Sequence, residues 1–148
     1  MAITTAFATS AKVELMTATH NFTNGTGHAW KVALIKAAPA GTYGAASTNY
    51  SNITGSSDES SGTGYSAGGN TLTATTPTSS GTTAFTDFVD SSWTTATFSA
   101  DGCMIYNSTS SNRCFSVHDF GGTKTVTAST FTLQFPAADA SNAILRLA

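Results

Sequence analysis

The residues that could carry out chemistry in this chain are few and scattered. Asp87 and Asp90 stand three positions apart, so in a strand they would face opposite sides of the sheet and could not act as a carboxylate pair. His118 and Asp119 are adjacent and have no second histidine or acid at the spacing of metal ligands. We therefore expect turn capping at the aspartates, and no catalytic, cofactor-binding or metal site.

A glycine-rich segment at 62–69 superficially resembles a phosphate-binding loop. It lacks the lysine of a P-loop and the third glycine at the dinucleotide-binding spacing, and no helix is expected after it. The segment is therefore expected to be a flexible turn and not a nucleotide-binding loop.

Cys103 and Cys114 are the two cysteines, one on each arm of an expected hairpin. A small shift of register could place them opposite each other, so a cross-strand disulfide is one interpretation. The N-terminal residues have neither the positive region nor the apolar stretch of a signal peptide, which predicts folding in a cytoplasm, where thiols stay reduced. Free, buried thiols are the favoured interpretation, and a catalytic thiol is the least favoured.

The hairpin that carries these cysteines is the clearest structural signal. Cys103–Asn107 and Arg113–Phe120 are rich in β-forming residues and flank a polar tip at Ser108–Asn112. Apolar residues alternate onto both faces of the pair, so we expect it inside the protein.

The remaining pattern predicts about eight short strands in total and one short helix. The helix is expected at Ser10–Met16, with Ser10 as its N-cap and with Val13 and Met16 as an apolar pair. Further strands are expected at 29–37, 70–76, 82–89, 93–98, 129–135 and 142–148, with a turn at 77–81. The fold class is all-β: an antiparallel β-sandwich or jelly-roll-like fold with one short N-terminal helix.

The 148 residues suit a single domain, 1–148, with two appendages. One is an N-terminal arm at 1–10. The other is a surface excursion at 39–69, longer than the about 12–15 residues of an ordinary loop. Phe7, Tyr43, Tyr50 and Tyr65 are the candidate interface residues, because aromatic side chains supply large contact areas. The alternative is that the tyrosines pin the excursion to its own domain.

Charged residues make up 9% of the chain, against a typical value of about 25%. The six Lys/Arg and eight Asp/Glu are scattered and form no basic face. This composition argues against nucleic acid as a partner. The absence of a sustained apolar stretch likewise argues against a membrane.

The order of short segments along the chain resembles a family of small structural proteins of tailed bacteriophages. The resemblance covers nearly the whole chain and depends on the order of the segments, since no single one is specific. The segments are Lys12–Leu15, His20–Phe22, Trp30–Leu34, Gly62–Tyr65, Ala67–Leu72, Asp87–Asp90 with Trp93, Ala96–Phe98, Ile105–Asn107, Asp119–Gly121, Thr130–Thr132, Phe135–Asp139 and Ala143–Arg146.

The resemblance implies a capsid decoration, or cement, protein that binds the outer surface of the major capsid protein shell and stabilises it. It also implies synthesis in the bacterial host cytoplasm, a final location on the capsid exterior of the virion, and a homo-oligomer, either a dimer or a trimer. A cement protein acts by burying surface across a seam, which needs adhesive area and no catalytic site. We expect the arm and the excursion to supply much of that contact.

Two other classes of function are weighed against this one. A tail or fibre module that binds a host receptor or glycan could use exposed aromatic residues to stack on sugars. An enzyme such as a polysaccharide hydrolase would need a paired acid or a metal constellation, and neither is evident in the sequence. The expectation is therefore a protein that is not an enzyme.

Overall fold

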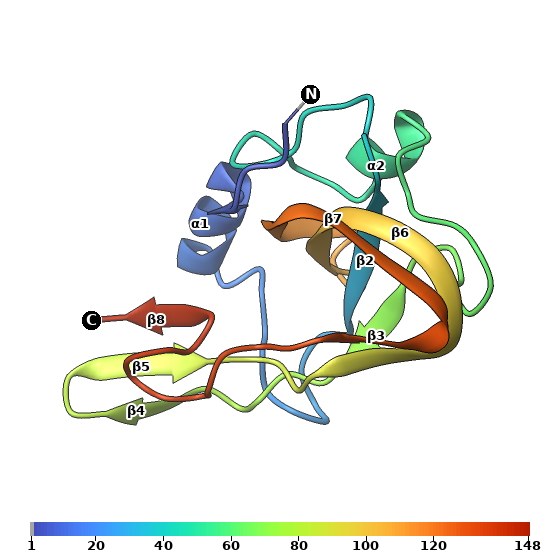
Figure 1. The fold of residues 1–148 in the computed structure, drawn as a ribbon. Helices are drawn as coiled ribbons and strands as arrows, with labels where there is room; N and C mark the ends of the chain where they lie inside the picture. Colours follow the sequence, from blue (N-terminus) through green and yellow to red (C-terminus); the bar gives the residue numbers. More distant parts are fainter. Residues whose placement is uncertain (1) are drawn as a thin grey trace.

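A long antiparallel hairpin forms the centre of the protein. In the computed structural model, which describes residues 2–148, its strands are β6 (Ser91–Asn107) and β7 (Arg113–Leu133) (Figure 1). The hairpin predicted at 103–120 is confirmed as its tip. The strands predicted at 93–98 and 129–135 belong to the same two strands and pair with each other at the base, where Trp93 lies opposite Phe131.

The hairpin bends sharply halfway along its length. Ala100 pairs with Lys124 and Gly102 pairs with Asp119, so residues 120–123 of β7 lie opposite Asp101 alone. Gly121 and Gly122 have φ values of 68° and 129°, which glycine adopts without the clash of a Cβ atom. A bulge of this kind bends its strand, so the two halves of the hairpin run in different directions.

The strands form two separate antiparallel sheets. The five-stranded sheet has the order β1-β7-β6-β2-β3, with β1 at Ala6–Phe7, β2 at Trp30–Lys36 and β3 at Asn70–Leu72. The three-stranded sheet has the order β4-β5-β8, with β4 at Thr78–Ser80, β5 at Thr83–Thr86 and β8 at Leu145–Leu147. Strand accounts for 46% and helix for 9% of the chain, which confirms the all-β, sandwich-like prediction.

Two short helices cover the upper part of the molecule in Figure 1, where the sequence predicted one. Helix α1 spans Thr9–Met16 and α2 spans Ser51–Gly55. The N-cap prediction was wrong: α1 begins after Ala8, and the Ser10 hydroxyl makes no hydrogen bond. Neither helix of the described chain is long and apolar enough to cross a bilayer.

The apolar pair noted in the sequence, Val13 and Met16, does not face the core. Val13 and Met16 are 53% and 80% exposed, whereas Glu14 is buried. Glu14 can be buried because it finds polar partners across the domain. Ala8, Ala11 and Leu15 form the apolar side of this segment that packs against the core.

The predicted hairpin over 70–76 and 82–89 is present in part and with a shorter turn, since residues 70–72 form β3 and pair with β2. Ala74 bridges to Phe88, and farther along the ladder Ser80 pairs with Thr83. The turn expected at 77–81 was wrong because its residues largely form β4, and the chain reverses only at Gly81. The C-terminal strand, predicted to be docked, pairs with β5 through Leu145 and Thr86.

The N-terminal residues fold onto their own domain. The Thr4 amide donates to the carbonyl of Tyr43 at 2.9 Å, and the Ala8 amide donates to that of Phe115 at 2.9 Å. Between them Ala6 pairs with Val117 of β7. Residues 2–10 of the arm expected at 1–10 thus pack against their own domain, while Met1 lies outside the described residues. Contact of the arm with the shell stays a prediction.

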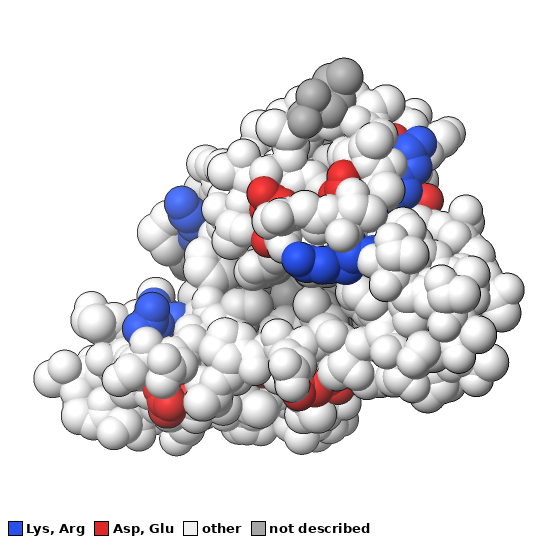
Figure 2. Space-filling model, in the orientation of Figure 1, with Lys and Arg blue, Asp and Glu red and all other residues white. Residues whose placement is uncertain are grey.

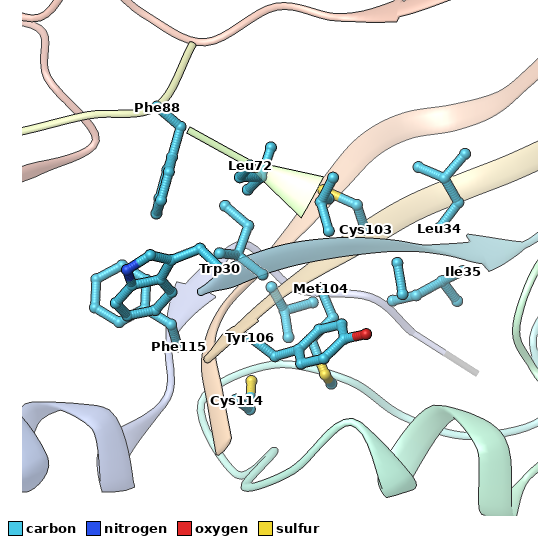
Figure 3. Packing of buried hydrophobic residues seen from close by; sticks show 14 of the residues in the cluster. Trp30, Leu34, Ile35, Leu72, Phe88, Cys103, Met104, Tyr106, Cys114 and Phe115 are labelled. Atoms are coloured by element: carbon cyan, nitrogen blue, oxygen red, sulfur yellow. The ribbon is translucent and has the colours of Figure 1, made fainter. Parts of the chain in front are cut away.

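Strand β2 runs through the core and is covered on both sides, although the sequence indicated one apolar face. Figure 3 shows Leu34 on one side of β2 and Ile35 on the other, and both are 0% exposed. At one end of β2, the Trp30 ring stacks on Phe22 with centroids 4.3 Å apart and meets Phe115 edge-on at 5.4 Å. This aromatic cluster joins the five-stranded sheet to the segments that cover it.

Candidate functional site

The hydroxyls of the three predicted interface tyrosines form hydrogen bonds with two acidic residues of the same segment, 39–69. The Tyr43 hydroxyl donates to Asp58 Oδ2 at 2.6 Å. Those of Tyr50 and Tyr65 donate to the two carboxylate oxygens of Glu59 at 2.5 and 2.9 Å. The link to the rest of the domain comes from the Leu34 amide, which donates to the Tyr65 hydroxyl at 2.9 Å, and from the Tyr106 ring, which stacks on Tyr50. These two contacts match the alternative in which the tyrosines pin the excursion to its own domain.

The interface prediction therefore needs correction at Tyr43, which is only 2% exposed. Tyr50 and Tyr65 are half-buried, and Tyr50 stacks on Tyr106 with centroids 4.7 Å apart. Their hydroxyls and much of their ring surface are already used within the chain. The remaining candidate, Phe7, is also half-buried but faces an open groove, described below.

Asp58 is the central anchor of the excursion. Its buried carboxylate accepts hydrogen bonds from the amides of Ala40 and Gly41 at 2.9 and 2.6 Å and from the Tyr43 hydroxyl, and it pairs with Lys36 at 3.0 Å. Desolvation opposes ionisation, but these donors together hold the pKa of Asp58 well below its usual value. The group is a fixed anion that organises the loop.

A second polar cluster brings together residues that the sequence did not connect. His20 Nε2 lies 2.8 Å from Glu14 Oε2, and Arg113 donates to Glu14 Oε1 at 2.6 Å. The Asn107 amide nitrogen lies 2.9 Å from His20 Nδ1 and 2.8 Å from His28 Nδ1. Because an amide nitrogen only donates, both Nδ1 atoms accept, and the His20 proton is assigned to Nε2, facing Glu14.

A carboxylate beside an imidazole is the arrangement of a general base, but this one has no free nitrogen. His20 Nδ1 is occupied by Asn107, and the His20 side chain is 0% exposed. Burial lowers the pKa of His20 against the opposing effect of Glu14. The cluster therefore acts as a buried polar clamp between α1, the 19–28 segment and the hairpin tip.

The cysteines and His118 do not form a reactive set. Cys103 lies opposite His118 in the β6–β7 ladder, whereas Cys114 lies opposite Tyr106, so the thiols are not paired with each other. Both are free and buried, as favoured from the sequence, and burial raises the pKa of each to about 12. Residues 2–148 contain no cluster of three or more metal-ligating side chains.

Replacing His118 by glutamine should flatten the pH dependence of stability between about pH 6.5 and 4. Burial lowers the pKa of His118 from 6.5 to about 4. In this window the unfolded chain binds a proton that the folded protein does not, so acidification destabilises the wild type by up to about 1.4 kcal/mol per pH unit. Urea unfolding of both proteins across the window measures this. A wild-type-minus-variant difference that stays constant with pH would contradict the assignment.

Asp87 and Asp90 anchor the returning C-terminal segment. Asp87 Oδ1 accepts from the Phe88 amide at 2.8 Å, and its Oδ2 accepts from the Ile144 amide at 3.0 Å. Asp90 accepts from the Phe135 amide at 2.8 Å. Both aspartates accept hydrogen bonds from backbone amides, as expected of capping residues. Their partners include the distant residues Ile144 and Phe135 as well as the local turn.

An open apolar groove of about 450 Å³ lies between α1 and β8. Figure 2 shows the molecule hollowed between its upper part, which contains α1, and the lower layer that ends in β4, β5 and β8. We call it the α1–β8 groove; its lining residues are Phe7, Ala11, Lys12, Leu15, Met16, Phe115, Leu145, Arg146 and Leu147. Met16 and Leu147 are 80% and 62% exposed, so large apolar side chains border it in solvent.

Sequence reasoning identified Phe7 but not the groove. Its walls come from α1 near the start of the chain and β8 at residues 145–147, and no local pattern shows that these meet. Met16 was noted in the sequence only as half of an apolar pair with Val13, and its position on the groove border depends on how the helix packs. Comparison of the chain with protein-family models, curated proteins and solved structures gives no match in any of the three.

Proposed function

We propose that the protein is a capsid decoration protein of a tailed bacteriophage, which attaches to the outer surface of the major capsid protein shell. The observation that carries the proposal is the α1–β8 groove with its exposed apolar border at Met16 and Leu147. Contiguous apolar surface of this kind on a small protein is typical of a protein-binding site. The resemblance along the chain supplies the identity of the partner.

The structure also bears on the receptor-binding alternative. Stacking on a sugar needs an exposed aromatic face. Tyr43, Trp93 and Tyr106 are 2%, 3% and 2% exposed, and Tyr50 and Tyr65 are half-buried. The aromatic residues that favoured a glycan are therefore mostly inside the protein, which leaves shell attachment with the stronger support.

Two aspartates in the groove border should abolish tight attachment. In the variant Met16→Asp/Leu147→Asp, both side chains are exposed in the free protein, so folding should persist while apolar contact with the shell is lost. We expect affinity for purified empty shells to fall at least about tenfold, measured by co-sedimentation, because each buried apolar side chain contributes about 1.5–3 kcal/mol.

Val89→Asp is the matched control, since Val89 is an exposed apolar residue, at 54%, outside the groove lining. Equal binding by the wild type and the double variant would remove the groove from the proposal. The copy number in purified virions, by quantitative mass spectrometry, tests location separately: a number close to that of the shell subunit supports decoration, and absence from the particle overturns it.

A further inference from the structure

We infer that the α1–β8 groove receives an extended segment of the shell subunit, which adds as a strand to the free edge of β8 and places a carboxylate beside its apolar side chains. The inference builds on the proposed function by giving the chemistry of the partner segment. Three features of the groove support it: its backbone edge, its apolar floor and its charge.

The first feature is that the groove runs along the unpaired backbone edge of β8. Leu145, Arg146 and Leu147 are consecutive in β8, and all three line it. Successive side chains of a strand point to opposite faces, so three in a row can border one groove only if it runs along the strand's edge. Strand β8 ends the order β4-β5-β8, so its other edge has no partner strand among the described residues. Such an edge offers backbone donors and acceptors to an added strand.

The second feature is the apolar floor of the groove, which favours apolar side chains in the bound segment. Leu15 and Leu145 line the groove and also a smaller pocket of about 150 Å³ that reaches Phe22 and Phe85. The two hollows thus share a wall, and together they can take more than one side chain of an extended segment. Because alternate side chains of a strand point the same way, we assign apolar residues two positions apart to these hollows.

The third feature is the positive charge that lines the groove, which favours an acidic residue in the bound segment. Lys12 on α1 and Arg146 on β8 line it, and no Asp or Glu does. Within residues 2–148, Lys12 takes part in no ion pair, and Arg146 donates to the Ser141 carbonyl. In a chain with only six Lys/Arg, two at one apolar groove favour a segment that carries Asp or Glu.

A first experiment tests the groove without shells. The probe is 8-anilinonaphthalene-1-sulfonate, which combines aromatic rings with one negative charge, titrated into the folded protein and followed by fluorescence. We expect binding by the wild type, about tenfold weaker binding by Lys12→Gln/Arg146→Gln, and wild-type binding by Lys124→Gln, which removes an exposed charge outside the groove. No binding, or equal binding by all three proteins, overturns the groove as a site for apolar anions.

A second experiment tests the strand and its source. Hydrogen exchange of the full-length protein is measured free and bound to empty shells, and a photo-crosslinking amino acid at Met16 identifies the contacted peptide. We expect slower exchange at 145–147 and a crosslink to a shell-subunit peptide containing Asp or Glu. Shell binding without these changes overturns the inference and leaves the proposed function standing. Failure of the wild type to bind shells overturns the proposed function and, with it, the assigned partner.

Discussion

Replacing Phe115 by alanine should lower the free energy of unfolding by about 3–5 kcal/mol. Phe115 is 0% exposed, and its ring contacts those of Phe7, Phe22 and Trp30 at centroid distances of 5.1, 5.2 and 5.4 Å. Removing the ring leaves a cavity where the hairpin, β1 and β2 meet, and these ladders restrict collapse around it. Urea unfolding followed by tryptophan fluorescence measures the loss.

Phe120→Ala is the matched control for this change. Phe120 lies on the same strand but at the bulge, is half-buried and meets Phe131 at 6.2 Å. Its removal should cost clearly less than that of Phe115, because solvent can fill the space. Similar losses in the two variants would show that the aromatic cluster at Trp30 is not the centre of the core.

Replacing Asp58 by alanine should cost about 3–5 kcal/mol, by a different mechanism. The change leaves the Ala40 and Gly41 amides and the Tyr43 hydroxyl without their acceptor. Each buried group left unpaired costs about 1–3 kcal/mol. We expect segment 39–69 to loosen first, seen as faster hydrogen exchange there and a lower urea midpoint.

Two further variants separate this effect from charge alone. Asp58→Asn keeps an acceptor of similar shape and should lose less than Asp58→Ala, whereas Asp119→Ala, at an exposed site, should change stability little. The folded pKa of Asp58 is lowered, so its contribution is present above the unfolded value near 3.8 and is lost as the pH falls through the folded value. An Asp58→Ala variant as stable as the wild type at neutral pH would contradict this role.

Asp58 is one of several buried polar residues whose partners lie within the protein. The polar groups that could do chemistry are committed to holding the fold: Asp58 and Glu59 to the excursion, and Glu14 and His20 to α1 and the hairpin tip. These polar groups therefore stabilise the fold, whereas the apolar groove is open to solvent.

The sequence by itself determined the strands, because alternation is a local property. The pair at 103–107 and 113–120, the strand at 29–37 and the C-terminal strand were all indicated by neighbouring residues. Each depends on side chains two positions apart, whose directions are set by the backbone of a single strand. The all-β class followed from these elements alone.

Only the tertiary structure decided which polar groups are buried and where the groove lies. Asn107 and His20 are 87 positions apart, and the groove joins α1 to β8 across nearly the whole chain. Glu14 and Tyr43 looked like surface residues because an unpaired carboxylate or hydroxyl is costly to bury. Their partners remove that cost, and such partners are found only when distant segments meet. Tertiary contacts therefore made the predicted contact residue Tyr43 a core residue and left Met16, half of the apolar pair expected in the helix, on the surface.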